Sequence, residues 1–225
     1  MTTPTVNPKT AKAYKGVAME GPIARWYART VRRDAEFKTW VSRVNETVAA
    51  GGRVLEVAPG PGFLSVELAR SGKYQVTGLD ISKTFVEIAQ AQARQANVPV
   101  DFRLGNASDM PFAGDTFDFV ICTAAFKNFT RPVQAIAEMQ RVLKPGGKAL
   151  IVDLRRDASR ADVDRLVDDM DMSWLNALFT RWTFRLMLLK TAYTPAEIRQ
   201  FVAQTKFRQC DIRSDAVGME IWLTK

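Results

Sequence analysis

The chain has 225 residues, of which 47% are apolar and 25% charged, and it carries a formal net charge of +8 with no histidine. This length and composition predict one large globular domain, or one domain with a cap, and exclude a disordered chain. The lack of histidine excludes Ser-His-Asp and Cys-His hydrolase mechanisms. The two cysteines, Cys122 and Cys210, do not have zinc-site spacing, so no metal is expected.

The charge and the N-terminal sequence limit which cellular compartment and which partners are expected. The first twenty residues contain no apolar signal core, and no apolar run approaches the ~18 residues of a membrane span, so we expect a cytoplasmic protein. Residues 1–50 hold nine basic and four acidic residues. Such clustered charge can attract nucleic acid, a membrane surface or an acidic substrate, although a solvated basic surface is the commoner explanation.

Hydrophobic periodicity predicts one helical stretch and then an alternating pattern. Gly21–Ala50 has helical spacing and ends at Gly51-Gly52. Short apolar runs then alternate with helical segments, which predicts βαβ units and a parallel sheet with helices on both faces. The predicted strands are Arg53–Ala58, Tyr74–Leu79, Pro99–Leu104, Phe117–Thr123 and Lys148–Leu154, and the predicted helices are Gly62–Ser71, Ser82–Ala96 and Pro132–Leu143, the last ending at Lys144–Gly147.

The C-terminal third has a different pattern. Residues 159–190 are predicted to be helical without an intervening strand, and Thr194-Pro195 begins a further helix that ends at about Gln204. Two closing strands, Phe207–Arg213 and Gly218–Thr224, are joined by a short turn, so they should be antiparallel neighbours. Within the helical stretch one stripe is apolar: Leu175, Leu178, Trp182, Leu186 and Leu189.

The segment "RVLEVAPGPGFLSVELA" has the outline of a nucleotide-binding turn, because a glycine-rich loop follows a strand and opens a helix. Ala58 replaces the first glycine of many such loops, which it can do if its φ is negative. Asp80 ends the next strand, at an offset that suits a carboxylate on ribose hydroxyls. Glu56 would repel a pyrophosphate but attract an ammonium group, which disfavours NAD and favours S-adenosylmethionine.

Five motifs in order resemble those of the class I S-adenosylmethionine-dependent methyltransferases. They are "LEVAPGPG", "GLDIS", "GNASDMPF", "FDFVICTAAFKNF" and "RVLKPGGKALIVD", and they cover about residues 50–155. The resemblance is nearest to the small-molecule branch that includes the ubiquinone/menaquinone-type C-methyltransferases. It implies an α/β, Rossmann-like doubly wound sheet of seven strands, mostly parallel with the last strand antiparallel, plus a helical cap.

The resemblance also implies a domain organisation and a cofactor site. Residues 1–50 would form a helical cap, 51–155 the cofactor-binding core, 156–194 a helical insertion or lid, and 195–225 the closing helix and strand pair. S-adenosylmethionine would be held at its methionine end by Glu56, Ala58, Gly60 and Gly62, at its ribose by Asp80, at its adenine by Ile81, Asn106 and Ala107, and near its sulfonium by Thr123. For Ile81 and Thr123, plain core packing is the alternative.

Methyl transfer needs a base only if the acceptor must lose a proton, since the sulfonium is already activated. The candidates for positioning the acceptor are Lys127, Asn128 and Tyr27. We expect Lys127 to be solvated at the mouth of the site and to attract an acidic acceptor, with a desolvated lysine base as the alternative. Further base candidates are Tyr14, Glu20, Asp153 and Tyr193.

The sequence therefore predicts methyl transfer from S-adenosylmethionine to a small, hydrophobic acceptor, with the acceptor atom open. Apolar residues of the 170–190 stretch suit such a molecule, or else they join cap to core: Met170, Met172, Trp174, Phe179, Trp182 and Met187. An RNA or protein methyltransferase that uses the basic N-terminal region is one alternative, although no RNA module is visible. A cofactor-binding protein without catalysis is another. The basic amphipathic 174–190 stretch could contact a membrane surface peripherally, and the oligomeric state is open.

Overall fold

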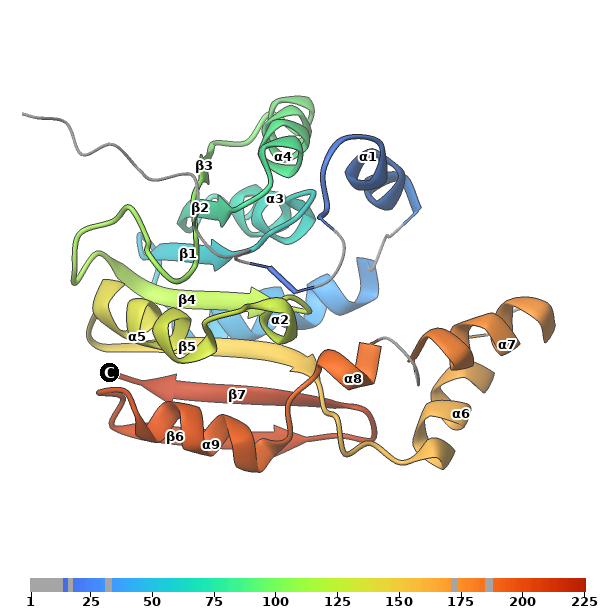
Figure 1. The fold of residues 1–225 in the computed structure, drawn as a ribbon. Helices are drawn as coiled ribbons and strands as arrows, with labels where there is room; N and C mark the ends of the chain where they lie inside the picture. Colours follow the sequence, from blue (N-terminus) through green and yellow to red (C-terminus); the bar gives the residue numbers. More distant parts are fainter. Residues whose placement is uncertain (1–13, 16–17, 31–33, 171–173, 185–187) are drawn as a thin grey trace, which may run out of the picture.

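The protein is built around one seven-stranded sheet (Figure 1). The structure is a computed structural model that describes residues 14–15, 18–30, 34–170, 174–184 and 188–225. The sheet order is β3-β2-β1-β4-β5-β7-β6. The strands are β1 (Arg53–Val57), β2 (Gln75–Asp80), β3 (Val100–Leu104), β4 (Phe117–Thr123), β5 (Leu143–Leu154), β6 (Gln209–Ser214) and β7 (Gly218–Thr224).

The pairing confirms the predicted topology. β1 to β5 pair in parallel, and β7 runs antiparallel to both β5 and β6. The two closing strands are therefore antiparallel neighbours, as their short connection requires. Between β1 and β4 the direction of winding reverses, and the carboxyl ends of these strands open the crevice in which doubly wound sheets bind their ligands.

Helices cover both faces of the sheet. They are α1 (Gly21–Thr30), α2 (Asp34–Thr47), α3 (Phe63–Arg70), α4 (Lys83–Gln95), a short 3₁₀ turn at Phe126–Asn128, α5 (Pro132–Val142), α6 (Arg160–Asp168), α7 (Trp174–Thr183), α8 (Leu189–Thr191) and α9 (Pro195–Ala203). One apolar cluster joins α2 and α3 to the sheet, through Val44 and Leu68 among others. A second cluster joins α5 and α9 to the opposite face, through Met139 and Ile198 among others.

Local sequence signals account for where several helices begin. The Ser82 hydroxyl accepts a hydrogen bond from the Phe85 N–H and so caps α4. Thr194 and Glu197 form a reciprocal capping box at α9, with Pro195 in its first turn. Each device satisfies backbone donors that have no partner inside the helix. These starts were predictable because they depend only on neighbouring residues.

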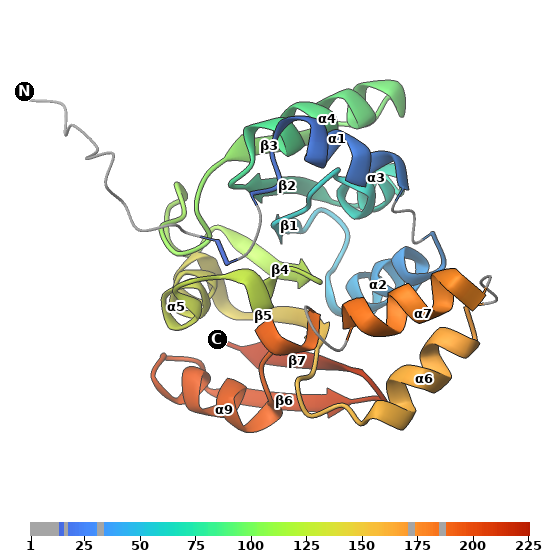
Figure 2. The ribbon, with the colours of Figure 1, turned by 45° about the vertical axis from the view of Figure 1, so that its right-hand side comes forward.

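Two predicted boundaries are wrong. Instead of one helical stretch over Gly21–Ala50 there are two helices, and α1 and α2 lie in different directions (Figure 2), with residues 31–33 outside the described part. β5 begins at Leu143, five residues before the predicted strand, because Leu143 pairs with Phe117 across a register irregularity in β4. Periodicity cannot detect the early start of β5, because it depends on pairing with β4.

The connections at the carboxyl edge of the sheet are the part that concerns function. α1, α6, α7 and α8 lie on the side to which the arrows of β1, β4 and β5 point (Figures 1 and 2). Residues 18–21 and the stretch Tyr14–Lys15 lie at the same edge, against segments that follow β2 and β4 respectively. Among the residues described, no helix is both long and apolar enough to cross a bilayer.

Candidate active site

The loop from β1 to α3 has the geometry of a ligand-binding turn. Ala58, Gly60 and Gly62 all have left-handed backbones, with φ of 56°, 55° and 82°. Gly62 also approaches α4 so closely that a Cβ there would lie 2.7 Å from that of Ala89. The expectation that Ala58 has a negative φ is wrong. The turn after β1 holds Ala58 in the left-handed region of φ, where alanine is strained and glycine would not be.

Asp80 lies at the end of β2 and points its carboxylate back to this loop. One oxygen accepts a hydrogen bond from the Gly60 N–H at 2.9 Å, and the other accepts from the Ser82 N–H at 2.8 Å. Burial raises the pKa of Asp80 to about 6, against the lowering effect of these hydrogen bonds. A carboxylate has about four acceptor positions, so Asp80 keeps capacity to accept a hydrogen bond from a ribose hydroxyl.

Glu56 is buried within β1, beneath the same loop. Its carboxylate accepts a hydrogen bond from the hydroxyl of Ser65 in α3, a neutral partner and not a cation. Desolvation raises the pKa of Glu56 to about 7, and the negative charge of Asp80 adds to the rise. A buried carboxylate next to a second one gains from a bound cation. This site therefore fits the ammonium end of S-adenosylmethionine better than a pyrophosphate.

The residues predicted to hold the adenine lie after β2 and β3. Ile81 is 44% exposed, which excludes core packing and leaves its side chain available to a ring. Asn106 Oδ1 accepts a hydrogen bond from the Ser108 N–H at 2.9 Å, so its remaining lone pair would have to serve adenine N6. Ala107 packs half-buried against the main core. Thr123 ends β4, half-buried, beside the crevice.

Lys127 is not solvated, contrary to expectation. Its ammonium donates to Asp153 Oδ1 at 2.8 Å and to the Ala124 carbonyl at 2.7 Å, and both side chains are nearly fully buried. Asp153, at the end of β5, is itself held by the N–H groups of Lys127 and Leu154, each at 2.8 Å. The sequence could not reveal this pair, because its members are 26 residues apart and meet only when β4 and β5 align.

The other two acceptor candidates belong to different elements at this edge. The Asn128 carbonyl accepts a hydrogen bond from the Lys15 N–H at 2.7 Å, which ties the N-terminal stretch to the segment after β4. Tyr27 instead packs edge-on against Phe85 of α4, with ring centroids 5.9 Å apart. Asn128 directly follows Lys127 in the chain. Burial raises the pKa of Tyr14, Tyr27 adds to the rise, and the backbone of Tyr14 pairs with Phe129.

Three residues have contacts at the site that the sequence did not predict, although Tyr14 and Glu20 were among the base candidates. Ser65 holds Glu56. Glu20 accepts hydrogen bonds from the N–H groups of Lys83 and Thr84, at 2.9 and 3.1 Å, and so fixes the N-terminal segment beside Asp80. Tyr14 feels the charges of both Asp80 and Asp153, and its pKa is raised, chiefly by burial. The contact of Ser65 could have been predicted, because a serine nine residues after Glu56 lies on the helix that follows β1. The contacts of Glu20 and Tyr14 could not.

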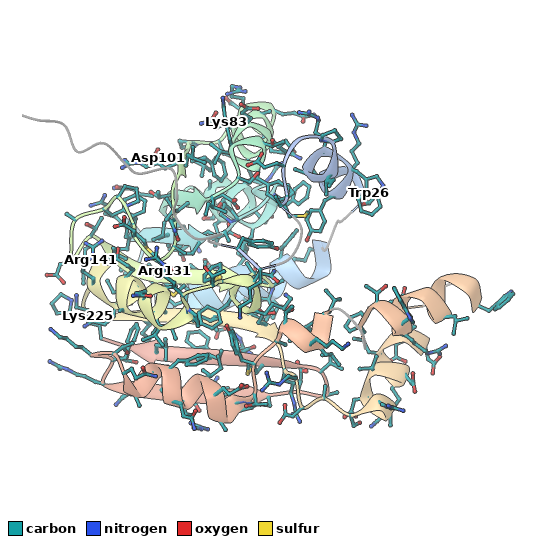
Figure 3. All side chains as sticks on the ribbon, in the orientation of Figure 1. Trp26, Lys83, Asp101, Arg131, Arg141 and Lys225 are labelled. Atoms are coloured by element: carbon teal, nitrogen blue, oxygen red, sulfur yellow. The ribbon has the colours of Figure 1, made fainter. Side chains whose placement is uncertain are left out.

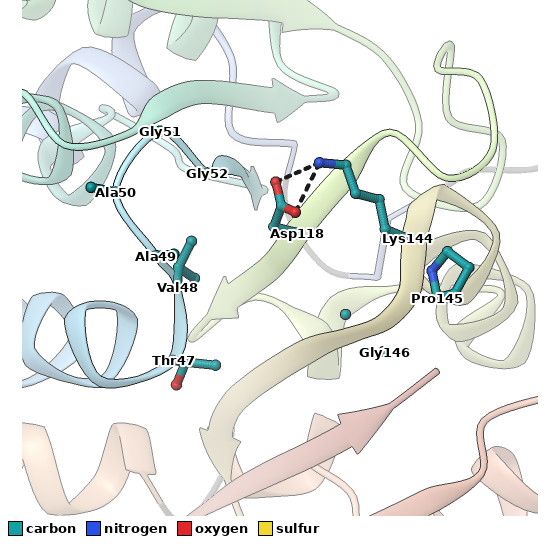
Figure 4. Close-up of a pocket in the computed structure, with 11 residues that line it drawn as sticks. Thr47, Val48, Ala49, Ala50, Gly51, Gly52, Asp118, Lys144, Pro145 and Gly146 are labelled. Carbon is teal, nitrogen blue, oxygen red and sulfur yellow. Dashed lines mark hydrogen bonds and ion pairs between the residues drawn. The ribbon is translucent and has the colours of Figure 1, made fainter.

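A hollow of about 460 Å³ lies at the opposite pole of the sheet and belongs to another part of the chain (Figure 4). It is lined by the turn that precedes β1, by the first residues of β5, and by Asp118, whose side chain forms an ion pair with Lys144 at 2.8 Å. These groups lie at the amino ends of parallel strands, away from the loop that carries Gly60. The hollow is therefore not the cofactor site.

The fold, the loop and the two buried carboxylates are similar to those of the class I S-adenosylmethionine-dependent methyltransferases. Residues 55–151 match the family described as methyltransferase domain, whose co-substrate is S-adenosylmethionine. Over 108 residues the chain is 34% identical to a demethylmenaquinone methyltransferase from Deinococcus radiodurans, covering 48% of this chain and 45% of the relative. It is 36% identical over 108 residues to a ubiquinone biosynthesis O-methyltransferase from Xanthomonas oryzae pv. oryzae, with the same coverage of 48% and 45%.

The likeness to solved structures concerns the fold. A methyltransferase from Aquifex aeolicus, described as dependent on S-adenosylmethionine, superposes with a TM-score of 0.62 at 16% identity, covering 86% of this chain and 99% of the other. The chain spans about half the length of the curated relatives that it matches. The match to the family model runs from β1 to β5 and does not extend to α1, α2 or α6 to α9.

Proposed function

We propose that this protein transfers the methyl group of S-adenosylmethionine to a small apolar acceptor of the quinol or phenol kind. The observation that carries the proposal is the pair of buried acidic groups, Glu56 and Asp80, set around one glycine-rich turn. An amine and a ribose diol, the two polar ends of the donor, match them in charge and hydrogen bonding. Relatives named as quinone methyltransferases support the acceptor class.

On the acceptor side we infer that Lys127 positions an oxygen of the acceptor. Two of its three N–H donors are used, by Asp153 and Ala124, so one is left to donate to a phenolic or quinol oxygen. While its ammonium is paired with a carboxylate, Lys127 acts as a donor and not as a base. Asn128 adjoins it and offers an amide to the same oxygen, and Tyr27 flanks the donor side.

When bound, S-adenosylmethionine supplies an activated methyl group on a positively charged sulfur. What remains for this chain is to hold donor and acceptor in line and to exclude water. Residues 51–155 would hold the donor, while the cap of residues 1–50 and the lid of residues 156–194 would close over the acceptor. The relatives include both a menaquinone-type and an O-methylating enzyme, so the acceptor atom is left to experiment.

The test is a methyl-transfer screen over quinols, phenols, thiols, amines and RNA, read by mass spectrometry of the products. We expect turnover with apolar quinols or phenols. Asp80→Ala should abolish both turnover and the thermal stabilisation by S-adenosylmethionine, which is about 2.7 kcal/mol at a hundredfold excess over Kd. Turnover on RNA alone would favour the nucleic-acid alternative, and donor binding without any transfer would favour a non-catalytic protein.

Lys127 needs a variant that separates positioning from folding. Lys127→Met alone would leave Asp153 buried and unpaired, at a cost of about 3–5 kcal/mol. We therefore expect Lys127→Met with Asp153→Asn to fold better than the single variant and still to raise the acceptor KM more than it lowers kcat. Unchanged KM for the acceptor in this double variant would remove Lys127 from the site. A fall in kcat of ~10²–10⁴ would instead indicate a base.

A further inference from the structure

Two helices beside the carboxyl edge of the sheet expose large apolar side chains. On α1, Trp26 is 65% exposed and Ile23 is 45% exposed; Figure 3 shows Trp26 projecting away from the sheet. On α7, Trp174 is 74%, Leu178 58% and Trp182 52% exposed. The spacing of four residues places the three α7 side chains on one stripe. We call the exposed faces of α1 and α7 the rim.

The opposite side of the α7 region is already occupied. Arg181 forms an ion pair with Asp164 of α6 at 3.3 Å. Just beyond α7, Phe184 packs on a small cluster that contains Val163 and Leu189. Because this side is packed on α6, the stripe that bears Trp174 faces outward. The alternative by which the apolar residues of the 170–190 stretch join cap to core does not hold for Trp174, whose side chain is the most exposed of the rim.

The charge on the rim has one sign. Neither α1 nor α7 contains an acidic residue. Arg25 and Arg29 are exposed on α1, and Lys190 is exposed on α8, the short helix that follows α7. Tryptophan and arginine on the outer face of a helix match the polar and apolar layers of a membrane interface. An anionic headgroup layer complements this charge, whereas an apolar protein partner would leave the arginines without counter-charges.

We propose that the rim is a docking surface for an anionic lipid bilayer. Trp26, Trp174 and Leu178 enter the headgroup layer, and the arginines of α1 contact lipid phosphates. Because α1 and α7 lie on the side to which the parallel strands point, docking sets the mouth of the donor crevice against the bilayer (Figure 2). This orientation lets an apolar acceptor dissolved in the lipid reach Lys127 without crossing water, an inference that rests on the proposed function.

The experiment is sedimentation of the full chain with vesicles, in the absence of S-adenosylmethionine and of any acceptor. Vesicles of phosphatidylcholine with phosphatidylglycerol should bind the chain at least tenfold more strongly than phosphatidylcholine alone, and 0.5 M salt should weaken the binding. Trp174→Ser with Leu178→Ser should reduce binding about tenfold. Because both side chains are exposed, the unfolding midpoint of this variant should stay unchanged, which shows that it folds.

A matched pair of variants tests the charge. Arg25→Gln with Arg29→Gln should lose about fivefold in binding per arginine, the usual contribution of a basic residue near an anionic surface. The control, Lys73→Gln with Arg208→Gln, removes two exposed basic residues just before β2 and β6, at the amino-end pole of the sheet. It carries the same net charge and should bind like the unmodified chain.

Three results would overturn the proposal: equal binding to neutral and anionic vesicles, equal losses in the rim and control pairs, or no vesicle binding at all. If the last came with concentration-dependent dimerisation that Trp174→Ser abolishes, the rim would be an interface between two copies of the chain. None of these results bears on methyl transfer, because the assay contains neither donor nor acceptor. Failure of the methyl-transfer screen would likewise leave the lipid measurement intact.

Discussion

At the scale of single residues, Glu56 shows how a binding group can oppose stability. Its carboxylate is buried next to Asp80, and its pKa is raised to about 7 by desolvation. We expect Glu56→Gln to stabilise the ligand-free protein at pH 8, because it removes a buried charge, and to weaken S-adenosylmethionine. Urea unfolding and calorimetric titration measure the two effects. A variant that lost stability and kept donor affinity would contradict the role assigned to Glu56.

The pH dependence of donor binding follows from the same group. Below pH 7 a growing fraction of Glu56 is protonated and cannot attract an ammonium. The Kd for S-adenosylmethionine should therefore rise by up to tenfold per pH unit as pH falls from 7 to 6, and more steeply below 6, where Asp80 also protonates. In Glu56→Gln the rise in Kd that begins near pH 7 should disappear, while the rise that begins near pH 6 should remain.

Ala58 makes a second prediction at this scale. Its φ of 56° costs an L-residue about 1–2 kcal/mol. Glycine would remove this strain, but part of the gain would be lost because glycine makes the unfolded chain more flexible. We expect Ala58→Gly to stabilise the protein by about 1 kcal/mol and to raise its Tm by about 2–4 °C. Ala91→Gly, on the exposed side of α4, is the matched control and should destabilise by about 1 kcal/mol. A loss of stability in both variants would refute strain at Ala58.

These residues also show which features of the site could be predicted from the sequence. The residue types of Glu56, Gly60 and Asp80, and their spacing, indicated a donor site because the loop and the strand ends are local features. The sign of φ at Ala58 and the burial of Lys127 were predicted wrongly. The burial of Lys127 depends on how β4 and β5 align, because that alignment brings Asp153 to it, and no local pattern contains this long-range outcome.

At the scale of elements, Glu20 anchors the N-terminal segment on α4. Desolvation raises the pKa of this carboxyl, but the hydrogen bonds from Thr84, Ser82 and Lys83 outweigh it, so the net pKa is lowered. The anchor is therefore present above the ordinary pKa of glutamate and is lost as pH falls through the lowered value. We expect Glu20→Ala to cost about 1 kcal/mol, as for the loss of a helix cap.

Hydrogen exchange measures whether that loss is local. In Glu20→Ala the amides of α1 and of the first turn of α4 should exchange faster, while the amides of β1 and β4 should keep their protection. Glu87→Ala, an exposed position on α4 paired only loosely with Lys83 at 3.9 Å, is the control and should leave both regions unchanged. Faster exchange throughout the sheet would mean that Glu20 supports the whole fold and not one segment.

The sequence predicted the core elements well and the peripheral ones poorly. The alternation of strands and helices fixed the parallel sheet, since each strand is a short apolar run and several helices carry their own caps. The helical stretch over 159–190 was predicted without its division into α6, α7 and α8. The exposure of Trp174 and Leu178 was not predictable, because apolar periodicity reports which side of a helix is apolar, not whether anything covers it.

At the scale of the whole molecule, the absence of histidine makes the stability curve unusually informative. Ordinary Asp and Glu titrate below pH 5, and the chain has no histidine to titrate above it. Among the described residues, the carboxyls whose pKa is raised to about 6 and about 7 are Asp80 and Glu56. Between pH 5 and pH 8, changes in unfolding free energy should therefore report mainly on the two groups at the donor site.

The sign of that change follows from proton uptake. Between pH 5 and 7 the folded chain holds protons on Glu56 and Asp80 that the unfolded chain has already released, so raising the pH favours unfolding. We expect the ligand-free protein to lose a few kcal/mol of stability from pH 5 to pH 8. Saturating S-adenosylmethionine should flatten this slope, because its ammonium and ribose hydroxyls stabilise the ionised carboxylates. Urea unfolding at pH 5, 6, 7 and 8, with and without the donor, measures both slopes. If the stability of the ligand-free protein rose with pH, the chain itself would already stabilise the ionised form of the two carboxyls. The donor crevice would then have no electrostatic reason to select a cation.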